Sequence, residues 1–477
     1  MSEAHEKRPS PVAGSPESAE TTPARKPFPT WRIVVWSIGN MGNTIVGGLT
    51  GLMTYFYLPP ETEQAAFPQL ISTKTILGLT LIGLISYLGG LVAVALGPFV
   101  AGWSDRSKSR LGRRRIFMLV SILPIGLLSY LMFVPPIDHV SPLNAVWLLA
   151  IIVFLNIFRS LYGVSNALVP EFGTSSRIIA LFNTFGPLFW LFGYIIGTQM
   201  VFMVKDMLMA TGMSALAAFR LTVGGMVAIG TILGCLQVWV VDERRYGSGK
   251  TSTVALWPAL KMAFKNRTFV LYTLIGQVYG WSDGLFQGGL VYTVTLIFGL
   301  SDSMMLAFGA TMAGLSLLVF PVASSVALKT GKKPLYLAAM AMLFFIMLVF
   351  AFGDKIPVPG LTMAWIMVIV AAIPVGITTV VPSAISQEII REDCLRTGEA
   401  KEATFNAAAG LITSIPSGFV GLIMPSLLLL GKSRDNPTGA RAIYIVSAAC
   451  LVAAFLMLRF LYDEKKLHAS LKEHGHV

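Results

Sequence analysis

The sequence predicts an all-α membrane protein in which twelve transmembrane helices form two pseudo-symmetric six-helix bundles. Three observations lead to this fold class: the composition, the number of long apolar stretches and an internal repeat. The chain has 477 residues, of which 55% are hydrophobic and only 13% are charged, and its mean hydropathy is +0.71. A soluble globular protein carries about 25% charged residues. The composition therefore excludes an ordinary soluble enzyme and a disordered protein, and favours a chain whose surface faces lipid.

Twelve stretches are apolar and long enough to span a membrane, because a bilayer core needs about 20 apolar residues per helix. Glycine, proline, serine and threonine recur inside these stretches, and small residues let neighbouring helices approach closely. The predicted spans are residues 31–57, 75–103, 116–134, 145–168, 178–204, 217–241, 268–299, 304–328, 335–353, 361–387, 403–430 and 441–462.

Polar segments divide the chain into five parts. Residues 1–30 are rich in proline, serine and glutamate and lack the apolar core of a signal peptide, so we expect a disordered cytoplasmic tail. The longest polar interruption, residues 242–267, separates an N-terminal bundle (31–241) from a C-terminal bundle (268–462). Residues 463–477 are expected to form a second cytoplasmic tail.

The basic residues predict the orientation of the spans. If the N-terminus is cytoplasmic, 28 of the 36 lysine and arginine residues fall in cytoplasmic segments. Seven, including Lys205, fall in the opposite loops, and Arg159 lies inside a span. This positive-inside pattern predicts a multi-pass protein of the cell (plasma or inner) membrane with both termini in the cytoplasm. The net charge of +12 is thus a sign of topology and does not indicate nucleic-acid binding.

An internal repeat supports the division into six helices plus six. In the second and eighth spans, a proline (Pro98 or Pro321) precedes a basic residue by eight positions. A turn of glycine and two basic residues then follows in both halves, at 112–114 and at 331–333. Repeats of this kind place a substrate site near the midplane of the membrane, between the two halves, and allow alternating access to it.

Three segments carry a resemblance to a known family. Residues 102–115 read GWSDRSKSRLGRRR, residues 388–402 read EIIREDCLRTGEAKE, and residues 168–170 read LVP at the end of the fourth span. These segments resemble loops of the major facilitator superfamily, and more narrowly of its glycoside–pentoside–hexuronide:cation symporters (the melibiose-permease-like branch) and its sucrose transporter group. The resemblance implies the major facilitator fold and secondary transport of a sugar or glycoside.

The resemblance also implies that the loop after the second span is a cytoplasmic latch for one access state. Arginine side chains in it can donate to carboxylates and to helix ends, and acidic partners are expected beside the 4–5 and 10–11 loops. The other interpretation is that all of these residues are solvated surface charges. The candidate gating residues are Asp105, Arg106, Arg110, Arg113, Arg114, Glu171, Glu388 and Glu402.

The chain departs from the family at the cation site. The melibiose-permease-like branch carries two carboxylates on its second helix, and the matching residues here, aligned on Pro98, are Ala93 and Gly97. Neither offers the charged oxygen that Na⁺ prefers. The branch's sugar-binding aspartates map onto Thr44 and near Tyr162. The resemblance therefore implies a sugar-transporter scaffold without that sodium site, and we expect neither a metal site nor a cofactor.

Two charged residues lie deep in predicted spans, where charge is costly and marks a functional site. Arg159, in the fourth span, could donate to sugar hydroxyls or to a substrate carboxylate, or could pair with another helix for structural reasons. Asp283, in the seventh span, is the candidate for proton coupling, because a poorly solvated carboxylate can take up a proton. Alternatively it is the counter-ion of Arg159 or a ligand at a helix break.

Polar and aromatic residues of several spans predict a sugar-binding cavity. Amide and hydroxyl groups suit sugar hydroxyls, and aromatic faces cover the apolar side of a pyranose ring. Tryptophan and tyrosine also gather at membrane interfaces, and helix packing is an alternative for the eleventh span. The candidate substrate-binding residues are Asn40, Asn43, Thr44, Arg159, Tyr162, Trp190, Tyr194, Trp281, Gln287 and Asn406.

The leading hypothesis is a transporter of a sugar or glycoside that works as a monomer in the lipid bilayer. It would be coupled to protons through Asp283 or uncoupled. A second hypothesis is transport of an amphipathic solute such as a lysolipid, which the long, methionine-rich apolar spans would suit. A third is a membrane sensor or assembly factor that no longer transports. An enzyme is not expected, because none of the five histidines lies in a predicted span and no pairing of a nucleophile with a base is suggested.

Overall fold

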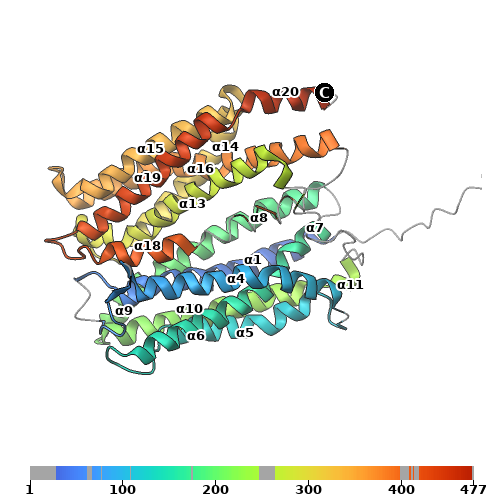
Figure 1. The fold of residues 1–477 in the computed structure, drawn as a ribbon. Coiled ribbons are helices and arrows are strands. Elements are labelled where there is room, and N and C mark those ends of the chain that lie inside the picture. The colour runs from blue at the N-terminus through green and yellow to red at the C-terminus, as the bar shows by residue number, and fades with distance from the viewer. Residues whose placement is uncertain are drawn as a thin grey trace, which may run out of the picture.

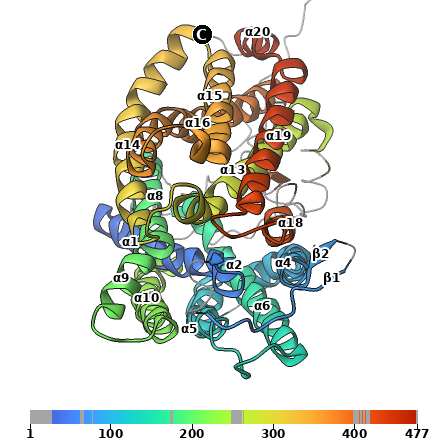
Figure 2. The same ribbon diagram turned by 90° about the vertical axis from the view of Figure 1, so that its left-hand side faces the viewer.

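The computed structural model describes residues 28–61, 67–76, 78–107, 109–172, 176–246, 261, 264–397, 405, 408, 409, 412 and 418–474. Its helices form two groups that lie one above the other in Figure 1, with their long axes roughly parallel. The same two groups are seen end-on in Figure 2. We call the end that carries α11 (Glu243–Tyr246) and α20 (Glu464–His474) the α20 end, and the opposite end, which carries α9 (Val201–Met209), the α9 end.

The first group contains the helices up to α11 and a two-stranded antiparallel hairpin, β1 (Thr75–Ile76) and β2 (Leu79–Thr80). Its fifth span is continuous through a π-helical turn, η2. The helices are α1 (Thr30–Gly51), α2 (Met53–Tyr57), α4 (Leu81–Arg106), α5 (Arg115–Leu131), α6 (Pro142–Tyr162), η1 (Gly163–Ala167), α7 (Leu168–Phe172), α8 (Ser176–Ile195), η2 (Ile196–Met200), α9, α10 (Ala215–Val240) and α11.

The second group begins with α13, which continues into a π-helical turn, η3. It ends with α20, which extends beyond α19 at the end of the molecule that carries α11 in Figure 1. Its helices are α13 (Arg267–Tyr292), η3 (Thr293–Ile297), α14 (Met304–Thr330), α15 (Lys332–Phe352), η4 (Gly353–Lys355), α16 (Gly360–Thr397), α18 (Phe419–Leu428), α19 (Thr438–Leu461) and α20.

Several helix boundaries differ from those expected from hydropathy. The second span begins at Leu81, because the preceding residues turn back at Gly78, whose φ of 79° favours glycine, to form the hairpin. The tenth span continues to Thr397, ten residues beyond the predicted boundary. Its charged last turns are held by pairs along the helix, such as that between Arg396 and Asp393 (2.7 Å). Lys205, which we expected in a loop, lies inside α9.

Seven of the described helices are long and apolar enough to cross a membrane, and three shorter apolar helices accompany them. Neither α1 nor α13 belongs to either set, although both run through the centre of the molecule beside α8 and α18 (Figure 2). Glycine and polar side chains lower their hydropathy. Both helices border the cavity described below, which explains why they carry polar residues that lipid-facing helices lack.

The predicted repeat has a structural counterpart at the α20 end. In the first group, Gly112 has a φ of 119° and opens the turn before α5. The carboxylate of Glu243 in α11 accepts hydrogen bonds from the backbone N–H groups of Arg114 (2.8 Å) and Arg115 (2.6 Å). A carboxylate thus satisfies free N–H groups at the start of a helix and lies at the positive end of its dipole.

The second group repeats this arrangement. Gly331 has a φ of 91° and precedes α15. The carboxylate of Glu464 in α20 accepts hydrogen bonds from the backbone N–H groups of Lys332 (2.7 Å) and Lys333 (3.2 Å). In both groups, therefore, the short helix after the sixth span caps the third span.

We expect Glu243→Gln and Glu464→Gln each to lower the free energy of unfolding by about 1–2 kcal/mol, because a charge-assisted hydrogen bond becomes a neutral one. Thermal unfolding of the purified protein measures the change. Glu473→Gln, at an exposed position of α20, is the control and should leave the unfolding temperature unchanged. Equal stability of all three variants would contradict the proposed capping role.

Candidate functional site

A cavity of about 950 Å³ lies between the two groups of helices. The first group contributes residues of α1, α2, α4, α6, η1, α8, η2 and α9, and the second contributes residues of α13, α14 and α18. The wall is mixed: hydroxyl and amide groups alternate with aromatic and aliphatic side chains. A site of this size, with a few polar groups at set positions, suits a small molecule.

Eight of the ten predicted substrate-binding residues line this cavity. Trp281 is not among the described lining residues; its ring stacks on Phe419, with centroids 4.5 Å apart. Asn406 lies outside the described residues. The eight are Asn40, Asn43, Thr44, Arg159, Tyr162, Trp190, Tyr194 and Gln287.

The two groups meet beside the cavity through Tyr194 of α8 and Gln287 of α13. The Tyr194 hydroxyl donates to Gln287 Oε1 (2.5 Å), and Gln287 Nε2 donates to Asp283 Oδ2 (3.1 Å). Tyr194 also stacks on Trp190, with ring centroids 5.5 Å apart and an interplanar angle of 17°. A single amide therefore joins a carboxylate of the second group to a hydroxyl of the first.

Arg159 reaches the cavity from the C-terminal end of α6. Its Nη2 donates to Thr50 Oγ1 of α1 (3.2 Å). Nearby, the Tyr162 hydroxyl donates to Gln237 Oε1 of α10 (2.5 Å). Arg159 and Asp283 form no ion pair with each other in this structure. The alternative that Asp283 is the counter-ion of Arg159 is therefore not observed.

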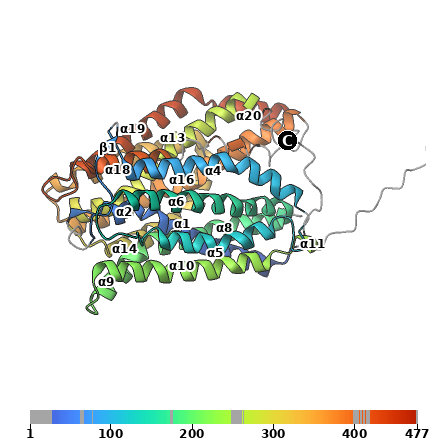
Figure 3. The same cartoon turned by 60° about the horizontal axis from the view of Figure 1, so that its bottom comes forward.

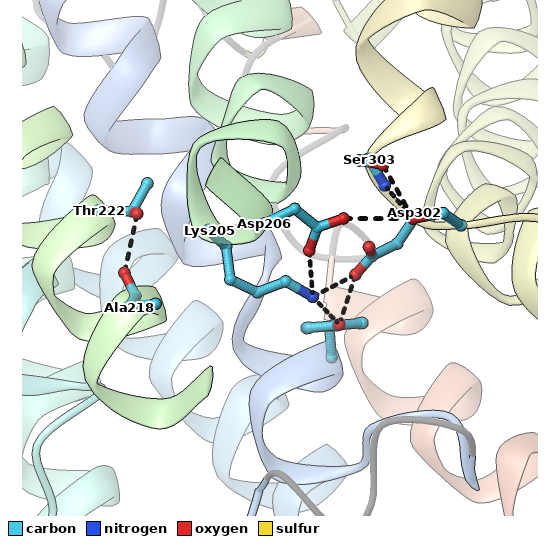
Figure 4. A network of polar contacts seen from close by, with 8 residues as sticks. Lys205, Asp206, Ala218, Thr222, Asp302 and Ser303 are labelled. Atoms are coloured by element: carbon cyan, nitrogen blue, oxygen red, sulfur yellow. Dashed lines mark hydrogen bonds and ion pairs between the residues drawn. The ribbon is translucent and has the colours of Figure 1, made fainter. Parts of the chain in front are cut away.

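A buried ion pair joins the groups at the α9 end (Figure 4). Lys205 Nζ of α9 lies 2.7 Å from Oδ2 of Asp302, which precedes α14 of the second group, and the two residues are 0% and 2% exposed. The Tyr55 hydroxyl donates to the same carboxylate oxygen (2.8 Å). Asp206 adds a second carboxylate 3.5 Å from the Lys205 ammonium group and accepts a hydrogen bond from Ser301.

Hydrogen bonds that involve the backbone also join the two groups near this pair. Tyr292 donates to the carbonyl oxygen of Leu58 (2.9 Å), and the N–H of Thr80 donates to Ser426 Oγ (3.0 Å). Helices α4 and α18 lie side by side in all three views, and Figure 3 shows α18 beside the part of α4 that is nearer the α9 end. Burial lowers the pKa of Lys432, in the loop that follows α18, and the nearby Glu61 opposes this effect.

Sequence reasoning missed Lys205 and Asp302 because each was assigned to a loop. A signal was present for Lys205: the residues on both sides of 205–206 are apolar for several positions, so the helix could continue past the charge. For Asp302 we find no comparable signal, because its burial depends on the approach of the other group.

The pairing predicted for the gating residues stays a prediction, and the contacts of only some of these residues are described. Glu388 contacts Lys332, and one of its oxygens lies 3.5 Å from His468 Nε2, so both of its partners belong to the second group. Arg110 is exposed, and the backbone of Arg114 is capped by Glu243. The side chains of Asp105, Arg106 and Glu171, and residue Glu402 altogether, lie outside the described residues.

Solved structures of transporters have the same fold. The nucleoside transporter NupG aligns with a TM-score of 0.58 at 13% identity, over 91% of this chain and 99% of that chain. The E. coli xylose transporter XylE, in a partially occluded inward open conformation, aligns with 0.57 at 13% identity, over 91% and 98%. The E. coli fucose:proton symporter FucP aligns with 0.52 at 13% identity, over 92% and 100%. This chain is thus a multi-pass membrane protein with the major facilitator fold.

The sequence profile of the MFS/sugar transport protein family matches residues 71–464. The chain belongs to this family, which confirms the resemblance found in its loops. Its members are transporters and not enzymes, so a small-molecule substrate is implied. Among curated proteins, no sequence matches the chain.

We expect Lys205→Met to lower the free energy of unfolding by about 3–5 kcal/mol, because it leaves the Asp302 carboxylate buried without its cation. The double variant Lys205→Met/Asp302→Leu should lose less than the single variant, since both charges are then absent. Thermal or denaturant unfolding in detergent measures the difference. Lys74→Met, at an exposed position near the hairpin, is the control. A double variant less stable than Lys205→Met would contradict the coupling of the two charges.

Proposed function

We propose that the protein transports a sugar or glycoside by alternating access, using the cavity between the groups as its substrate site. The observation that carries this proposal is the chemistry of the wall: asparagine, threonine and tyrosine groups of α1 and α8 stand beside the stacked rings of Trp190 and Tyr194. Such a wall can hydrogen-bond hydroxyls while a ring face covers the apolar side of a pyranose. Membership of the sugar transport family supports the same substrate class.

We propose further that the α20 end faces the cytoplasm and that this conformation opens toward it. The positive-inside pattern supports the orientation. The Lys205–Asp302 pair and the contacts between α4 and α18 support closure of the opposite side. In this scheme the pair is the outer gate and must separate when substrate enters from outside. In this scheme the loop at 104–115 acts within the first group, where Glu243 caps the start of α5.

Coupling to protons is proposed to occur at Asp283. While the carboxylate is ionised, it can only accept, so Gln287 must present its amide nitrogen to Asp283 and its oxygen to Tyr194. A protonated Asp283 can itself donate a hydrogen bond to Gln287. The Gln287 amide is then free to rotate, which changes its hydrogen bond to Tyr194 of the first group. Proton uptake thus alters a contact between the halves, which is the requirement for coupling to alternating access.

A second candidate substrate is an amphipathic solute. The wall of the cavity also includes apolar side chains such as Phe202, Met305 and Met424. An acyl chain could lie against them while a polar head contacts α1. A thermal-shift comparison of sugars with lysolipids distinguishes the candidates, because a ligand stabilises the folded state it binds. Stabilisation by lysolipids alone would favour this alternative over the sugar.

We expect Asp283→Asn to abolish sugar accumulation driven by an inward proton gradient and to leave counterflow exchange within about twofold of wild type. The amide keeps the shape and the hydrogen bond to Gln287 but cannot bind a proton. Uptake into proteoliposomes with and without a pH gradient measures both activities. Asp435→Asn, an exposed aspartate, is the control. Undiminished accumulation in Asp283→Asn would remove this residue from the coupling mechanism.

Uptake is also expected to be independent of Na⁺, because Ala93 and Gly97 stand where the related branch has its carboxylates. Replacement of Na⁺ by choline in the transport assay tests this. A large loss of uptake in choline would show that another set of oxygen ligands binds sodium in this chain.

A further inference from the structure

The fifth span, formed by α8, η2 and α9, contacts the second group at three depths. Beside the cavity, the Tyr194 hydroxyl of α8 donates to Gln287. At the α9 end, Lys205 pairs with Asp302. Between these two levels, the π-helical turn η2 carries Gln199, which is 5% exposed and borders the cavity. Turns of this kind are rare and frequently mark functional sites.

The carboxamide of Gln199 lies directly against Gly309 of α14, in the second group. A β-carbon at position 309 would overlap this carboxamide, so a larger residue there would displace it. Gly309 stands within the regular helix α14, and its φ is not positive. The contact therefore uses the missing side chain of this glycine and not its conformational freedom. We call the place on Gly309 that the carboxamide occupies the glycine seat.

In the glycine seat, the oxygen of Gln199 lacks a hydrogen-bond donor. Its Oε1 atom is buried and accepts no hydrogen bond from the described residues. Gln199 also borders a second pocket, of about 30 Å³, whose other described lining residues are all apolar and belong to the second group. A water in such a pocket would find one polar side chain, whereas buried waters make about two to four hydrogen bonds. The seat thus carries the cost of a buried acceptor without a donor.

The glycine seat exists only while the α9 end is closed, because it joins η2 of the first group to α14 of the second. Separation of the groups at that end removes Gly309 from beside the carboxamide. The Gln199 oxygen can then turn toward the cavity, where a sugar hydroxyl is the donor that it lacks. One carboxamide cannot occupy both places, so the seat and the substrate compete for it.

We propose that Gln199 is a substrate-binding residue whose oxygen is withheld from the cavity when the α9 end closes. This inference rests on the proposed function and adds to it a difference in affinity between the two access states. A protein whose binding-competent form is only partly populated has a reduced apparent affinity. Closure of the α9 end therefore weakens the hold on the substrate, which favours its release at the α20 end.

The substitution Gly309→Ala tests this proposal, because the three atoms nearest to the added methyl group all belong to the flexible side chain of Gln199. The methyl group fills the glycine seat and leaves the carboxamide turned toward the cavity. The matched control is Gly314→Ala in the same helix, where an added β-carbon meets nothing within 4 Å. The other variants are Gln199→Ala and Gln199→Ala/Gly309→Ala. Thermal unfolding without ligand shows whether each variant is folded.

Binding is measured on the purified full-length protein with D-glucose, D-galactose, sucrose, melibiose and maltose. The sugar that stabilises the wild type most against thermal unfolding is then titrated by calorimetry. We expect Gly309→Ala to bind this sugar about threefold or more tightly than the wild type, because the competing seat is filled. Gly314→Ala should match the wild type. In the Gln199→Ala background, Gly309→Ala should bring no gain in affinity.

Three results would overturn the inference. Binding by Gly309→Ala that is no tighter than that of the wild type would show that the glycine seat does not compete with the substrate, and would leave sugar transport intact. A gain in affinity that persists in Gln199→Ala/Gly309→Ala would arise from the packing of α14 and not from Gln199. Failure of every sugar to stabilise the wild type would contradict the proposed function itself, and this inference with it.

Discussion

The buried ion pair between Lys205 and Asp302 joins the two groups of helices at the α9 end, and the rest of the arrangement depends on it. Charges at this depth are stable only when paired and hydrogen-bonded, and here each comes from a different group. Tyr55 completes the set with a hydroxyl directed at the same carboxylate oxygen. Closure at this end holds the two groups of helices close together. Because they are close, they enclose the deep part of the cavity.

The cavity between the groups gathers many polar side chains. The helices α1 and α13 both contribute to its wall, and both are absent from the set of strongly apolar spans. They occupy equivalent places in the six-helix repeat, as the first span of each half. The same equivalence appears at the α20 end, where Glu243 and Glu464 cap α5 and α15.

Composition and hydropathy were sufficient to predict the fold class, because lipid imposes long apolar helices on any chain that crosses it repeatedly. The repeat of glycine and basic residues at 112–114 and 331–333 could also be recognised in the sequence, but the glutamates that cap the helices after it were not predicted. The tetrapeptides DERR at 242–245 and DEKK at 463–466 carry that signal. Eight cavity residues could be named in advance because polar side chains are rare in membrane spans. Trp281 satisfied the same criterion, yet its ring packs on Phe419, because helix rotation decides which side chains face the cavity.

What the sequence could not predict is pairing between distant segments. Lys205 and Asp302 are 97 residues apart, and nothing local to Asp302 distinguishes a buried, paired aspartate from one in an exposed loop. The contrast with Arg159 emerges only when both deep cations are seen with their surroundings: one has two carboxylates within 4 Å, and the other has a threonine hydroxyl and an open cavity. Burial is costly for both cations, and of the two only Lys205 has carboxylates of the described residues within 4.0 Å.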